Sequence, residues 1–224
     1  MNNTFSANMI KVFDECPQKY YLIYEKGISL PQDKTPAKEG ENIHALISYY
    51  LKGYNIDKLI NVLNEKEKAL WQNFLELKFT QKDVEACEKS FNYNFDGLNW
   101  LTGRIDAIIK EENTFVIYDW KTGKIPSNPE ESPQTIIYLF SIFAKLKQQN
   151  KINNYNDLKM VYLNLKTLEK TEVKLDKRYH SYINDYICNK IAKINNKAEI
   201  LPAKSSENTC KKCTLKTFCK YNEN

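Results

Sequence analysis

The sequence predicts an α/β protein in which a mixed β-sheet is flanked by helices. Apolar residues recur at helical spacing near the start, strand-like segments fill the middle, and the order helix, strands, helix, strands, helix follows. The chain has 224 residues, 42% hydrophobic and 27% charged, which suits one domain with a substantial core. We expect a single domain over residues 1–224, with 1–85 mainly helical, the core in 89–200 and a cysteine-containing tail in 205–224.

The N-terminal part is expected to be helical. In ENIHALISYYL, residues 41–51, apolar side chains fall on one stripe with the period of a core-facing helix. Residues 57–79 continue with helix-forming residues at similar spacing. We therefore predict a helix in each of these segments.

A meander of strands is expected next. Residues 90–95 lead into the turn signal Asp96-Gly97, and residues 98–110 and 114–121 have the composition of strands. A helix over 134–150, two strands within 158–167 and 169–175, and a helix over 181–196, ending before Pro202, complete the prediction. This order implies a mixed sheet with helices on its faces.

Charge and hydropathy narrow the class of protein. The net charge of +5 is compatible with a polyanionic partner but is a weak signal. The N-terminus has no apolar run of signal-peptide type, and the longest apolar stretch, IIYLFSIFA, is too short to cross a bilayer. We expect a cytoplasmic protein without a membrane partner, whose six cysteines are reduced thiols or metal ligands.

Two aspartates interrupt the strands of the predicted hairpin GRIDAIIKEENTFVIYDWK. If Glu112-Asn113 forms a tight turn, Asp106 lies opposite Asp119, with Cβ atoms roughly 5 Å apart on one face. Lys121, two residues further on, shares that face. Two carboxylates at this distance repel each other unless one is protonated or a cation lies between them.

Two interpretations of the hairpin remain open on spacing alone. In one, a Mg²⁺ or Mn²⁺ ion lies between the acids, where metal and lysine together suit hydrolysis of a phosphodiester. In the other, the hairpin is an ordinary surface hairpin in which Asp106 pairs with Arg104 or Lys121.

Several motifs together resemble a known family. GRIDAII and YDWKTGK, the helix EGENIHALISYYL with His44, the pair Gln134 and Tyr138 in QTIIY, and the cysteine segments CPQKYYL and CKKCTLKTFC occur in one order. This set is similar to the RecB-like branch of the PD-(D/E)XK nucleases, in particular its CRISPR-associated RecB-type and AddB-like iron–sulfur exonucleases. The resemblance spans nearly the whole chain and implies a restriction-endonuclease-like fold.

The resemblance also implies roles for these residues. His44, Asp106 and Asp119, with the backbone carbonyl of Trp120, would bind the divalent metal. Lys121 would orient the attacking water and stabilise the transition state. Gln134 and Tyr138, four residues apart on one helical face, would reach the lysine or a DNA strand. His180 lies in no motif, and we expect it to have a packing role.

The cysteines fall into two groups. Cys210, Cys213 and Cys219 form C-x₂-C-x₅-C, and Cys16 lies far upstream. The resemblance implies that these four hold a structural [4Fe–4S] cluster that joins the chain ends, and zinc is the alternative occupant. Cys87 and Cys188 have no suitable neighbours and are expected to be small buried residues.

The resemblance implies a metal-dependent DNA exonuclease acting on single-stranded ends. Its biological role would be CRISPR spacer acquisition in antiviral defence, with a CRISPR integrase or a helicase as partner, or phage or DNA-repair metabolism. Two further classes remain open: a non-catalytic iron–sulfur module that binds DNA ends, and a structural zinc protein in which Asp-x-Lys is accidental.

Overall fold

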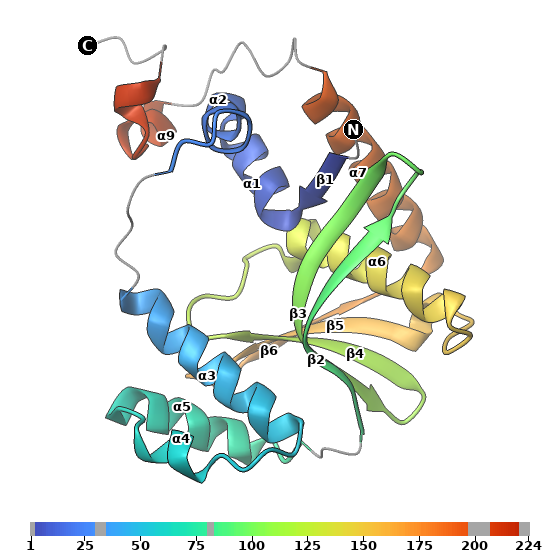
Figure 1. Cartoon of the computed structure of the whole chain (residues 1–224). Coiled ribbons are helices and arrows are strands. Elements are labelled where there is room, and N and C mark those ends of the chain that lie inside the picture. Colours follow the sequence, from blue (N-terminus) through green and yellow to red (C-terminus); the bar gives the residue numbers. More distant parts are fainter. Residues whose placement is uncertain (1–2, 30–34, 80–82, 197–206, 220–224) are drawn as a thin grey trace.

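The computed structural model describes residues 3–29, 35–79, 83–196 and 207–219, and its centre is a six-stranded mixed sheet (Figure 1). The strand order is β1-β3-β4-β5-β6, with β2 also paired to β3. The pairs β1–β3 and β4–β5 are parallel and the others antiparallel. The strands are β1 Asn3–Ser6, β2 Val84–Asn94, β3 Asn99–Glu111, β4 Thr114–Lys121, β5 Leu158–Asn164 and β6 Lys170–Lys174.

Helices cover both faces of the sheet, as predicted (Figure 1). One face packs against α3 (Thr35–Leu51) and α5 (Glu65–Glu76), with α4 (Asp57–Asn61) beside them. The other packs against α1 (Ala7–Glu15), α6 (Pro133–Gln148) and α7 (Lys177–Asn195). The short helices α2 (Pro17–Tyr20) and α9 (Glu207–Lys211) lie near the chain ends. None of the helices in the described ranges is long and apolar enough to span a bilayer.

The burial pattern of α3 explains its position. Ile43, Leu46, Ile47 and Leu51 are at most 2% exposed and form the stripe predicted from the sequence. Burying such a side chain contributes about 1.5–3 kcal/mol, so this stripe anchors the helix to the sheet. The residue after Ile43, His44, is consequently held where the sheet face meets solvent.

Three expectations for the N-terminal half need correction. Residues 57–79 form two helices, because Asn64 caps α5 in a capping box with Glu67 and thereby starts a new helix. Residues 3–6 form strand β1 within the part expected to be mainly helical. This strand has one buried residue, Phe5, and is too short to show a period. Strand β2 begins at Val84, ahead of the predicted start of the core.

The predicted hairpin register is confirmed along the described ladder. Cross-strand pairs run from Glu111–Thr114 to Ala107–Tyr118, and the next positions on the two strands are Asp106 and Asp119. The turn has a positive φ of 53° at Glu112.

Strand β3 has an interrupted edge. β2 pairs along one edge of β3 over residues 100–109, so β1 and β4 share the other edge. On that edge β1 pairs up to Thr102, and β4 pairs from Ala107 onward. In the register of the described strands, residues 103–106 have no strand partner there. We call this stretch the β3 gap, and it lies where β4 separates from β3.

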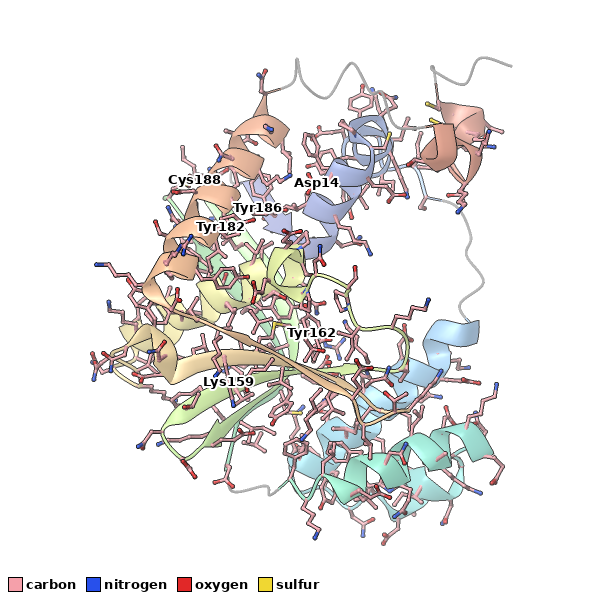
Figure 2. All side chains as sticks on the ribbon, turned by 180° about the vertical axis from the view of Figure 1, so that it is seen from behind. Asp14, Lys159, Tyr162, Tyr182, Tyr186 and Cys188 are labelled. Carbon is pink, nitrogen blue, oxygen red and sulfur yellow. The ribbon has the colours of Figure 1, made fainter. Side chains whose placement is uncertain are left out.

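The two cysteines outside the terminal group differ in burial. Cys87 is buried, as expected, but Cys188 is exposed, so the prediction for it was wrong. Figure 2 shows Cys188 on α7 with Tyr182 and Tyr186. Cys188 comes directly after Ile187, which belongs to the buried stripe of α7, so the Cys188 side chain is turned away from the core. That stripe consists of Ile183, Ile187, Ile191 and Ile194.

Candidate active site

Two side chains satisfy the backbone at the β3 gap. The hydroxyl of Tyr138 on α6 donates a 2.7 Å hydrogen bond to the backbone carbonyl of Arg104. Asp106 Oδ2 accepts a 2.8 Å hydrogen bond from the backbone N–H of Trp120. Buried backbone groups without a strand partner need such replacements. The gap is therefore built into the fold, and it holds Asp106 at the end of the hairpin.

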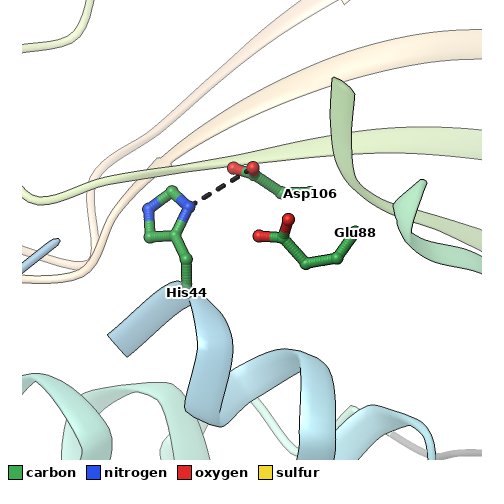
Figure 3. Close-up of side chains that lie close together, drawn as sticks. All are labelled: His44, Glu88 and Asp106. Carbon is green, nitrogen blue, oxygen red and sulfur yellow. Dashed lines mark ion pairs between the residues drawn. The ribbon is translucent and has the colours of Figure 1, made fainter. Parts of the chain in front are cut away.

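His44, Glu88 and Asp106 meet on the α3 side of the sheet (Figure 3). His44 Nδ1 lies 3.3 Å from Asp106 Oδ1, and one ligand atom from each of the three residues lies within 4.8 Å of the others. They line a cavity of about 510 Å³, which Trp120 and Lys121 also line. We call this the α3-side cavity. Imidazole and carboxylate groups at this spacing can hold a divalent cation.

Glu88 was not predicted as a site residue. It faces Asp106 across the β2–β3 pairing, since its neighbours pair with Ala107 and Ile105, and it has a positive φ of 47°. Its carboxylate forms an ion pair with Arg104. Only the long-range pairing of β2 with β3 identifies Glu88, because the segment ACEKS has no motif that marks it.

A second set of contacts joins Asp119, Lys121 and Gln134. Lys121 Nζ lies 2.6 Å from Asp119 Oδ2. Gln134 Nε2 donates to Asp119 Oδ1 at 2.5 Å, and Gln134 Oε1 accepts from Lys121 Nζ at 3.2 Å. Gln134 lies in the first turn of α6, on the opposite face of the sheet from α3. The site thus receives side chains from both helical layers at the end of the β3–β4 hairpin.

Electrostatics around Asp119 resemble those of a cation site. Its side chain is only 7% exposed, and the contact of its Oδ2 is the ammonium group of Lys121. Burial and then the negative charge of Asp106 raise the pKa of Asp119 to about 6, while Lys121 and His44 act in the opposite direction. Asp106 is therefore close enough to destabilise the ionised form of Asp119.

His44 responds to the same negative charges. Burial opposes protonation of the imidazole, but the hydrogen bond to Asp106 and the charges of Asp106, Asp119 and Glu88 outweigh it. The pKa of His44 is raised as a result. The site therefore has an excess of negative charge that a bound cation would relieve.

The alternative interpretation of the hairpin required Asp106 to pair with Arg104 or Lys121. In the structure Arg104 pairs with Glu88, and Lys121 pairs with Asp119. Asp106 instead contacts His44 and the Trp120 N–H. These contacts contradict the surface pairing that the alternative proposed.

Tyr138 and His180 have packing contacts. Tyr138 is 7% exposed and reaches the Arg104 carbonyl, and no hydrogen bond to Lys121 occurs among its described contacts. His180 packs against the rings of Phe140, Phe143 and Tyr155, and burial lowers its pKa. The packing role expected for His180 agrees with these contacts.

The structure brings the distant cysteines towards each other. α9 lies near α2 in Figure 1, and the Cys16 thiol interacts electrostatically with Cys210 and Cys213. Burial, more than these neighbours, raises the pKa of Cys16, and its sulfur accepts a 3.4 Å hydrogen bond from the Lys19 N–H. Cys219 follows a short 3₁₀ turn, Lys216–Phe218. The segment around Cys16 and the segment 207–219 therefore approach each other, in line with what the family resemblance implies.

Comparison with known proteins defines the class of this chain. The family model of the PD-(D/E)XK nuclease superfamily matches residues 4–220, so the chain belongs to that superfamily. The restriction-endonuclease-like fold class predicted from the sequence agrees with this family and with the six-stranded sheet. A nuclease is the class of protein that the family and the fold support.

Solved structures agree on the fold. The crystal structure of SSO0001 is 16% identical, with a TM-score of 0.51 over 100% of this chain and 89% of that one. A "Putative exonuclease" from Eubacterium rectale is 12% identical, with a TM-score of 0.55 over 99% of this chain and 89% of that one. No curated protein matches the sequence significantly.

Proposed function

We propose that this protein is a divalent-metal-dependent deoxyribonuclease that acts as an exonuclease on single-stranded DNA ends. The observation that carries the proposal is the convergence of His44, Asp106, Asp119 and Lys121 where β4 separates from β3. These four residues come from the motifs that resemble the RecB-like branch. The neighbouring structure named as an exonuclease is consistent with this activity.

The residues present fit a divalent ion. Asp119 Oδ2, which is buried beside the Lys121 ammonium group, and the cluster of His44, Glu88 and Asp106 offer hard oxygen and imidazole ligands. We propose His44, Asp106, Asp119 and the Trp120 carbonyl as ligands of Mg²⁺ or Mn²⁺, with Glu88 beside them. When bound, the ion supplies Lewis-acid stabilisation of the phosphate and lowers the pKa of water.

The other side chains would position these groups. Lys121 carries a positive charge beside Asp119, where it would stabilise negative charge on the phosphate oxygens. Gln134 holds Asp119 and Lys121 together through its amide. Tyr138 supports the backbone next to Asp106 and is proposed as a positioning residue. It does not need to touch the substrate for this role.

We further propose that Cys16, Cys210, Cys213 and Cys219 hold a structural [4Fe–4S] cluster. The cluster is proposed because the positions of these four cysteines resemble the iron–sulfur arrangement of the RecB-like branch. Zinc is the alternative occupant.

A role in CRISPR spacer acquisition, with an integrase or helicase partner, is the biological context we propose from the RecB-like motifs. Phage or DNA-repair metabolism would require the same chemistry. Degradation of a host strand independent of any CRISPR component would favour the repair or phage role. Co-purification with an integrase would favour the CRISPR role.

Digestion of end-labelled single- and double-stranded DNA with Mn²⁺, with and without a chelator, tests the activity. We expect stepwise loss of the label from single strands, no cleavage with chelator, and no cleavage by Lys121→Ala. Binding to DNA ends that survives Asp119→Ala, together with an inactive wild type, would instead identify a non-catalytic DNA-binding module. Cleavage by Lys121→Ala at the wild-type rate would overturn the site assignment.

A further inference from the structure

A second cavity, of about 880 Å³, opens on the α6 side of the proposed active site. Its wall is formed by the start of α1, residues 102–103 of β3 and the segment from Lys121 to the first turn of α6. We call it the α6-side cavity. Lys121 lines both this cavity and the α3-side cavity, so the two meet at the proposed catalytic lysine. Gln134 and Tyr138 also belong to its wall.

The two cavities differ in charge. Three ammonium groups, of Lys11, Lys121 and Lys124, line the α6-side cavity, against one carboxylate, of Glu131. The α3-side cavity holds more carboxylates, those of Glu41, Glu88 and Asp106, beside the side chains of His44, Arg104 and Lys121. A polyanionic backbone is therefore attracted to the α6-side cavity, whereas the acidic side suits a cation.

Lys11 and Lys124 are available to bind an anion. Both are exposed, and in the described parts of the chain neither forms an ion pair. Lys11 lies on α1 and Lys124 follows β4, so the fold brings them to one cavity from distant parts of the sequence. α6 also begins in this cavity, where the side chain of Ser132 makes no capping hydrogen bond. Its positive helix end adds to the attraction for anions.

We propose that the α6-side cavity binds the phosphodiester backbone of single-stranded DNA next to the scissile phosphate, with Lys11 and Lys124 as phosphate-binding residues. This inference rests on the proposed function and adds the substrate's path to it. The occupant is taken as single-stranded in keeping with the proposed function, and comparison with a duplex tests this choice.

Binding can be measured without turnover in an Asp119→Asn background. The probe is a fluorescein-labelled 20-nucleotide oligo-dT, and its anisotropy is followed at several KCl concentrations. Adding Lys11→Glu and Lys124→Glu should weaken binding at least about tenfold and make the salt slope shallower by about 1.4, since each single-strand phosphate contact contributes roughly 0.7. The matched control is Lys58→Glu with Lys110→Glu, an equal charge change at exposed positions outside both cavities.

An equal loss in the control, or unchanged binding by the Lys11 and Lys124 variant, would overturn the inference. Tighter binding of a blunt duplex or of an oligo-U RNA would overturn single-stranded DNA as the occupant. Thermal unfolding of all variants shows whether they are folded. If the variant with Lys11→Glu and Lys124→Glu is unfolded, the variant with Lys11→Ala and Lys124→Ala replaces it. A wild type that binds as expected but does not cleave would contradict the proposed function and leave this site standing.

Discussion

Gln134 and Asp119 form a 2.5 Å hydrogen bond in which the amide Nε2 donates to Oδ1. The same amide accepts from Lys121, so one side chain of α6 sets the positions of an acid and a lysine on β4. Because Gln134 lies in the first turn of α6, the position of this helix on the sheet determines the geometry of the site. A residue on the following helix thereby orients two residues of one strand.

Gln134→Ala should lower kcat for single-strand cleavage by up to about 100-fold, because misplacement by about 1 Å has effects of that size. KM should change little, since the amide contacts protein groups in the structure. Steady-state kinetics on the labelled strand measure both. Cleavage by Gln134→Ala at the wild-type kcat would contradict the positioning role.

Tyr138→Phe removes the hydroxyl that donates to the Arg104 carbonyl at the β3 gap and that also interacts with the Gln134 side chain. We expect a loss of about 1–3 kcal/mol in the free energy of unfolding. The fall in kcat should be smaller than for Gln134→Ala, because the ring still packs against Phe91. Urea denaturation measures the first quantity. A fully stable but inactive variant would assign Tyr138 to the chemistry.

Gly103 lies in the β3 gap where no larger residue fits. A Cβ atom there would lie 2.6 Å from the ring of Tyr138 and 2.7 Å from that of Phe91. Both rings are buried in the core, so Gly103→Ala should destabilise the fold by about 1–3 kcal/mol. Gly123→Ala, where a Cβ meets nothing within 4 Å, is the control for thermal unfolding. Equal melting temperatures for the two variants would contradict this packing.

Metal-free stability should depend on the charge of Asp119. Its pKa is raised to about 6 from the ordinary 3.8, so the folded protein binds an extra proton between these values and loses stability as the pH rises. The side chain of Asp119→Asn remains neutral. The free energy of unfolding of this variant should therefore rise relative to that of wild type between pH 4 and 6, by roughly 2–3 kcal/mol in total. Urea titrations with chelator at several pH values measure this difference. A difference that stays constant with pH would contradict the raised pKa.

The metal bound by Cys16, Cys210, Cys213 and Cys219 can be identified in the purified protein. Anaerobically prepared wild type should be brown and contain iron, and Cys213→Ser should lose both iron and solubility, because the proposed cluster would join Cys16 to the C-terminal cysteines. Cys188→Ser, at an exposed position on α7, is the matched control. A colourless wild type containing zinc would identify a zinc site. A soluble, stable Cys213→Ser would mean that the cluster is not needed for folding.

The sequence was sufficient for elements whose signal is local. The buried stripe of α3 and the register of the hairpin followed from periodicity and turn position. Strand β1 was missed because its four residues show no period, and it is held in the sheet by parallel pairing with β3. The break between α4 and α5 depends on the capping box of Asn64, a local signal that the helical composition obscured.

Some residues of the candidate site could likewise be identified from the sequence, and others only from the fold. Asp119 and Lys121 could be placed together because one strand carries both. Glu88 could not, because only the pairing of β2 with β3 brings it opposite Asp106. The role of Tyr138 was also hidden, since the β3 gap that its hydroxyl fills is a property of three strands together.

Calorimetric titration of the protein with Mn²⁺ most directly tests whether the two acids at the end of the hairpin hold a divalent ion. We expect saturable binding to wild type, and at least about tenfold weaker binding to Asp106→Asn and Asp119→Asn. Asp157→Asn, which changes a half-buried acid that accepts from the backbone N–H groups of Asn153 and Asn154, outside both cavities, should bind as wild type does. Unchanged Mn²⁺ affinity in both site variants would contradict the account.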